Sequence, residues 1–117
     1  MENTQKYKYH CRPGYGSVEL LIEVFNGAGD NYFGVDLFDA IGEIHPHAAG
    51  REDLWMNNEI LYTIQSDCGP FTISKDIWGL AFIMAGNNQD CIRRIDELLQ
   101  NDSRFEKCVV DFKKYQE

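Results

Sequence analysis

Two segments of alternating side chains flank a turn in the middle of the chain, and this pattern constrains the fold most. Apolar β-branched and aromatic residues alternate with their neighbours over residues 60–65, and the alternation resumes over residues 71–73. The four residues at 67–70, Asp-Cys-Gly-Pro, are typical of a turn. A period of two residues indicates a strand with one buried face. The segment therefore predicts a β-hairpin.

Two helices are predicted to follow the hairpin. Ser74 can cap the first helix, with Asp76 in its first turn, where a negative charge suits the helix dipole. Residues 77–84 leave that helix almost no polar face, so we expect it in the core. Gly86 and two asparagines end it, and the second helix has an inward stripe: Cys91, Ile92, Ile95, Leu98 and Leu99. The helical hairpin of residues 75–100 is expected to supply most of the core.

The first half of the chain gives weaker signals. Residues 7–11 alternate and predict an edge strand or an ordered arm, while residues 17–25 fit both a strand and a helix; β-branching favours the strand. A turn at 26–30 precedes a short strand at 31–35. Asp36 then caps a brief helix that ends at Ile41 or Ile44, because the segment from His45 to Gly50 breaks it.

The tail also fits two patterns. Residues 104–115 could form a helix, with a capping box at Ser103 and Glu106, or a strand with Cys108, Val110 and Phe112 inward. We favour the strand. The predicted fold is therefore α+β, an antiparallel sheet of about five strands with two C-terminal helices packed on one face. One domain is expected over residues 1–117, with residues 1–5 disordered.

Charge excludes some classes of partner. The 117 residues include 11 Lys and Arg against 19 Asp and Glu, a net charge of −8. Nucleic-acid binders and binders of anionic membranes use basic patches, so neither class is expected. The polar N-terminus has no secretory signal, and the four cysteines are far apart, which favours reduced thiols in the cytoplasm.

Two alternatives for chemistry stay open. His10, His45 and His47, together with the cysteines, could bind zinc, but the ligands are not in the close pairs that zinc sites use. Cys68 could be a nucleophile if a histidine lies beside it. We expect neither a metal nor another cofactor, and no catalytic residues.

The acidic charge is concentrated in one segment. Residues 13–74 contain ten acidic residues and a single basic one, Arg51. Aromatic residues within this stretch, surrounded by acids, suit an interface core with a charged rim. The predicted partner-binding residues are Asp30, Tyr32, Asp36, Asp39, Glu43, Glu52, Asp53 and Trp55.

A family resemblance covers residues 69–112. It is carried by Phe-Thr-Ile-Ser-Lys-Asp-Ile-Trp at 71–78, a following apolar helix, and Asn-Asn at 87–88; it continues with Ile92, Ile95, Leu98, Leu99, Phe105, Lys107 and Val-Asp-Phe at 110–112. This run resembles the small immunity proteins of bacterial contact-dependent inhibition and polymorphic-toxin systems. The resemblance implies a cytoplasmic, non-enzymatic protein that binds one cognate toxin domain and blocks its active site. No functional motif matches, so no binding residue is carried over.

An inhibitor of a nuclease toxin is the function expected from the resemblance and the charge together. A nuclease needs a basic cleft to hold phosphates, and an acidic inhibitor can compete for that cleft. Two other classes remain: a regulatory or homodimeric binding module, with Trp78 or a strand edge at the dimer interface, and an enzyme that uses Cys68 or a histidine.

Overall fold

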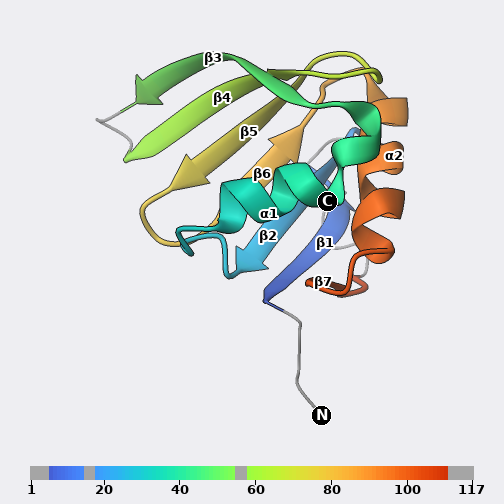
Figure 1. Ribbon diagram of the computed structural model, residues 1–117, viewed down its shortest axis with the longest axis horizontal. Coiled ribbons are helices and arrows are strands. Elements are labelled where there is room, and N and C mark those ends of the chain that lie inside the picture. The colour runs from blue at the N-terminus through green and yellow to red at the C-terminus, as the bar shows by residue number, and fades with distance from the viewer. Residues whose placement is uncertain (1–5, 15–17, 55–57, 111–117) are drawn as a thin grey trace.

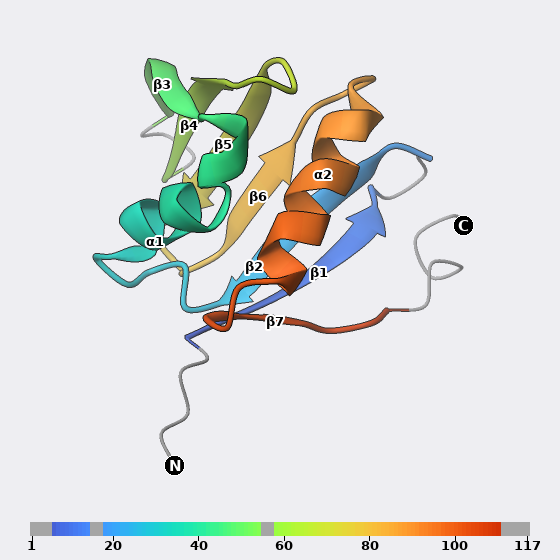
Figure 2. The same cartoon turned by 45° about the vertical axis from the view of Figure 1, so that its right-hand side comes forward.

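The computed structural model describes residues 6–14, 18–54 and 58–110. Elements follow in chain order as β1 (Tyr7–Pro13), β2 (Leu20–Asn26), α1 (Phe33–Ala40), a 3-10 turn η1 (Gly42–Ile44), β3 (His47–Leu54), β4 (Glu59–Gln65), β5 (Phe71–Asp76), β6 (Ala81–Met84), α2 (Gln89–Gln100) and β7 (Phe105–Lys107). Both helices lie on the same face of the sheet (Figures 1 and 2). Neither has the length and apolar character needed to span a bilayer.

The described residues form one mixed, seven-stranded sheet. Its strand order is β3-β4-β5-β6-β2-β1-β7, and every neighbouring pair is antiparallel except β1 and β7, which are parallel. β1 is therefore an inner strand and not the predicted edge. The parallel pair brings the first and last described strands together, with the Tyr7 and Phe105 rings stacked at 4.7 Å between centroids.

The core lies between the sheet and the helices. Alternate residues of each strand point to the helix face, and those of the inner strands are almost fully buried, for example Tyr9 on β1, Ile22 on β2 and Ile83 on β6. The stripe predicted for the second helix is confirmed on α2, because all five of its residues are buried. The hairpin of β4 and β5 is also confirmed. The strand predicted for residues 17–25 is confirmed from Leu20 on, since β2 spans Leu20–Asn26.

The predicted antiparallel sheet of about five strands with two C-terminal helices is wrong, because the sheet of the described residues is mixed and has seven strands. Residues 77–80 form a turn, Ala81–Met84 is strand β6, and α2 is followed by β7. β6 lies between β5 and β2 in the sheet, with Ala81 and Ile83 toward the helices and Phe82 and Met84 on the outer face. An inner strand with side chains packed on both faces shows no polar alternation, so its sequence looks like that of a buried helix.

Three further expectations differ from the structure. Residues 31–35 are not a strand; they lead into α1, which begins at Phe33 and not at Asp36. The segment after His45, predicted only as a break, forms the edge strand β3, whose residues are exposed almost throughout. Up to residue 110, where the described part of the tail ends, only Phe105–Lys107 form a strand. The predicted disorder of residues 1–5 and the inward position of Phe112 fall outside the described residues.

Candidate protein-interaction surface

Two turns meet at one end of the sheet. The turn at 27–32 connects β2 to α1, and the turn at 77–80 connects β5 to β6; both lie at the same end of the molecule (Figure 1). They approach so closely that a Cβ built on Gly29 would lie 3.6 Å from the Cα of Gly79. Side chains from both turns therefore share one surface.

The turn between β5 and β6 holds two large apolar side chains in solvent. The carboxylate Oδ1 of Asp76 accepts the backbone N–H of Trp78 at 2.9 Å and that of Leu80 at 3.0 Å, and Gly79 has φ +84°. Only glycine adopts that left-handed conformation without strain. The tight turn leaves Ile77 and Trp78 outside the core, with 70% and 69% of each residue exposed.

The neighbouring turn exposes an aromatic ring in the same way. Oδ1 of Asp30 accepts the backbone N–H of Tyr32 at 2.8 Å, and this Asx turn leads into α1. Tyr32 is 65% exposed, and the Lys6 amine lies 5.7 Å from the centroid of its ring. Asp30 and Tyr32 thus remain accessible, as the prediction of a binding surface requires.

Two carboxylates face each other beside these turns. Glu59 on β4 is directly opposite Asp76 on β5, on the face of the sheet away from the helices. Neither forms an ion pair with any residue that the structure describes. Like charges directly opposite in a sheet repel each other. We define the tip surface as these two residues together with the exposed groups of both turns: Asp30, Tyr32, Glu59, Asp76, Ile77 and Trp78.

Half of the eight predicted contact residues form ion pairs within the chain. Asp36 and Asp39 pair with Arg104 at 3.2 and 2.8 Å, Glu43 pairs with Arg94 at 2.9 Å, and Asp53 pairs with Arg51 at 2.9 Å. Glu52 is exposed on the outer face of β3, and Trp55 lies outside the described residues. Of the predicted set, only Asp30 and Tyr32 belong to the tip surface.

Asp36 has a structural role. Its carboxylate accepts the Tyr7 hydroxyl at 2.5 Å and also pairs with Lys6 and Arg104. The Tyr7 hydrogen bond contributes most to lowering the pKa of Asp36, and the two cations lower it further. Burial and the same carboxylate raise the pKa of Tyr7. These contacts connect α1 to β1 and to the loop before β7.

The histidines and cysteines considered as a zinc site or as a nucleophile with its base do not come together within the described residues. His10 bonds Glu23 at 2.7 Å on the outer face of the sheet, whereas Cys11 faces the helices. His45 bonds Asp67 at 2.6 Å, while the Cys68 thiol contacts the Cys91 thiol and no histidine. Over residues 6–14, 18–54 and 58–110, no group of three or more His, Cys, Asp or Glu side chains could hold a metal ion.

Sequence reasoning missed Ile77 and the opposed pair of carboxylates, and it named Trp78 only for a possible dimer interface. The pattern of residues 77–84 predicts a buried helix, and the opposition of Glu59 and Asp76 follows from strand register. Asp76 and Gly79, three residues apart, were the available turn signal. The family resemblance also included an apolar helix after Trp78, where the structure has a turn and β6. No family model, curated protein or solved structure matches the chain.

Proposed function

We propose that the protein is a non-catalytic inhibitor that binds a cognate toxin domain in the cytoplasm and covers its basic active-site cleft with the tip surface. The observation that supports this most is the exposure of Trp78 and Ile77 beside carboxylates that have no cation partner within the described chain. Tryptophan and tyrosine are enriched among the residues that dominate binding energy at protein interfaces. The toxin class we propose is a nuclease, because its cleft must be basic.

Electrostatics favours a basic partner at this surface. Glu59 and Asp76 repel each other across the strands, and a lysine or arginine placed between them would replace that repulsion with two charge-assisted hydrogen bonds. The carboxylates of Asp36, Asp39, Glu43 and Asp53 add less, since cations of the same chain already pair with them. The acidic surface we propose is therefore smaller than the acidic segment of the sequence.

Co-expression tests the proposal directly. The toxin domain is taken from the reading frame next to the gene for this chain, and survival of cells that express it is scored with and without this protein. We expect the wild-type chain to protect and Trp78→Ser to lose protection, with an increase in Kd of about thirtyfold or more. Val18→Ser is the matched control, because Val18 is 84% exposed and precedes β2, at the opposite end of that strand from the turn at 27–32.

Salt dependence tests the electrostatic part separately. Replacing Glu59 and Asp76 by Gln and Asn should lower the association rate and flatten its decline with ionic strength, because exposed charges are screened by salt. If toxin affinity is the same at low and high salt, charge does not drive recognition. If Trp78→Ser protects as well as the wild type, the tip surface is not the contact.

A homodimeric module is the second candidate. β3 is an edge strand that pairs within the described residues only with β4, so its other side could pair with a second copy. The successive charges of Arg51, Glu52 and Asp53 oppose such pairing. Light scattering after size exclusion should give the 13.5 kDa monomer, and a mass twice that value would favour the dimer.

A further inference from the structure

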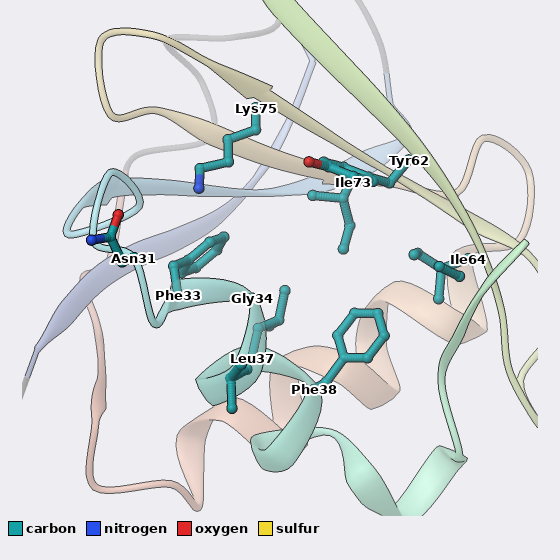
Figure 3. A pocket seen from close by; sticks show the side chains of 11 residues that line it. Asn31, Phe33, Gly34, Leu37, Phe38, Tyr62, Ile64, Ile73 and Lys75 are labelled. Atoms are coloured by element: carbon teal, nitrogen blue, oxygen red, sulfur yellow. The ribbon is translucent and has the colours of Figure 1, made fainter. Parts of the chain in front are cut away.

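A cavity of about 580 Å³ lies between α1 and strands β3, β4 and β5 (Figure 3). Its volume falls within the range of roughly 300–1,000 Å³ that is typical of small-molecule sites. α1 supplies Leu37 and Phe38 to one wall, and the sheet supplies Ile64 and Ile73 to the other. Most of the lining is apolar, so the cavity suits a ligand with an apolar body.

The polar groups of the cavity are gathered toward one side. The Lys75 amine and the Tyr62 hydroxyl point toward the Phe33 side, whereas Phe38 and Ile64 lie at the other side (Figure 3). The amine is 5.6 Å from the centroid of the Phe33 ring, so a cation–π contact offsets part of its desolvation. The cavity therefore has a polar end and an apolar end.

Neither polar group finds a full partner in the part of the chain that the structure describes. Lys75 forms no ion pair there, and the Tyr62 hydroxyl forms no hydrogen bond. Arg51, the other cation near Tyr62, is already paired with Asp53. Lys75 is partly buried at this cavity, so an anion bound beside it gains a charge-assisted hydrogen bond without displacing an existing ion-pair partner among the described residues. The group that best complements this cavity is thus a negatively charged head next to an apolar body.

Charge also limits the class of anion. The chain has a net charge of −8, which disfavours a ligand with several negative charges such as a nucleotide. Among the described residues that line the cavity, Lys75 is the one cation, which is enough for a single carboxylate, and that carboxylate can also accept the Tyr62 O–H.

We propose that this cavity binds a linear monocarboxylic acid, with its carboxylate on Lys75 and Tyr62 and its hydrocarbon chain among Leu37, Phe38, Ile64 and Ile73. The site shares no residue with the tip surface. It goes beyond the proposed inhibitor function and does not depend on it.

Calorimetric titration of the full chain with decanoate tests the proposal. Decyltrimethylammonium carries a tail of the same length with a positive head, and acetate carries the same head with almost no tail. We expect one decanoate to bind per chain and both control compounds to bind at least tenfold more weakly. Equal binding of the cationic compound would overturn the proposal, as would the absence of decanoate binding.

Three variants locate the ligand. Lys75→Met keeps an apolar stem and removes the charge, and it should weaken decanoate binding at least tenfold. Lys8→Met, an exposed lysine on the outer face of the sheet, should leave it unchanged. Gly34→Leu adds a side chain from α1 at the cavity lining, where a Cβ meets nothing within 4 Å, and should abolish binding. Urea unfolding confirms that each variant folds. Unchanged affinity in folded Lys75→Met and Gly34→Leu would refute the site.

Discussion

Removing the Trp78 side chain should cost little stability, although tryptophan is the largest apolar residue in its segment. A tryptophan side chain offers up to about 250 Å² of surface, and Trp78 is 69% exposed, so folding buries about 80 Å² of it. At about 25 cal/mol per Å² this is worth at most about 2 kcal/mol, and about 1 kcal/mol once the compactness of the unfolded chain is considered. Trp78→Ser should therefore destabilise the fold by about 1 kcal/mol.

Ile83→Ala is the matched comparison on the same hairpin. Ile83 is fully buried on β6, between Ile22 and Ile73 in the sheet. Its truncation removes three carbon atoms, worth about 2.4 kcal/mol of transfer free energy. The cavity left behind raises the expected loss to about 3–4 kcal/mol.

Urea unfolding at equilibrium measures both variants. With equal m values of about 1–3 kcal/mol/M, the urea midpoint should fall about three to four times further for Ile83→Ala than for Trp78→Ser. If residues 77–84 were a core helix, Trp78→Ser would cost as much as Ile83→Ala or more. That result would refute both the strand assignment of β6 and the availability of Trp78 for a partner.

Three other outcomes are expected. The pKa of Asp36 is lowered in the folded state, so its ionised carboxylate stabilises the fold above about pH 4. This stabilisation is lost as the pH falls toward the folded-state pKa. Asp36→Asn should therefore flatten the decline of the urea midpoint between about pH 5 and pH 2. Oxidised glutathione should convert Cys68 and Cys91 into a disulfide worth up to about 3 kcal/mol, because the Cys68 thiol is near enough to Cys91 to raise its pKa. Mass spectrometry should show the loss of two hydrogens, and Cys91→Ser should show none. Gly27→Ala should destabilise the fold by more than 1 kcal/mol, because φ is +94° and a Cβ would lie 2.5 Å from the Lys6 carbonyl oxygen. In the same urea unfolding, Gly34→Ala in α1 should stabilise the fold by about 0.5–1 kcal/mol, since a Cβ there meets nothing within 4 Å.

Local patterns predicted the elements that have one solvent-facing side. α2 shows a five-residue apolar stripe beside charged residues, and the hairpin of β4 and β5 shows alternation around a Gly-Pro turn. Both patterns arise from the contrast between a buried and an exposed face. β6 lacks that contrast because Phe82 and Met84 pack on the outer face while Ala81 and Ile83 face the helices. The sequence of β6 therefore lacks the two-residue alternation that would have indicated a strand.

The interaction surface depended on contacts between distant residues. Glu59 and Asp76 are opposed only because β4 pairs with β5 in one particular register, and a shift of one residue would separate them. The charge count placed Asp36 and Asp39 in an open acidic field, but both form ion pairs with Arg104, which follows α2. Such pairing across the chain has no signature in local composition. Exposure of Trp78 likewise depended on recognising a turn of a few residues within an apolar run.

The parallel pairing of β1 with β7 has a consequence for synthesis. A ribosome adds about 5–20 residues per second, so Tyr7 leaves the tunnel on the order of ten seconds before Phe105 can stack on it. During that interval β1 has an open edge, with the Tyr7 and Tyr9 rings uncovered on the Phe105 side. A nascent chain stalled before Phe105 should therefore recruit chaperones or aggregate, and its release should restore a soluble protein.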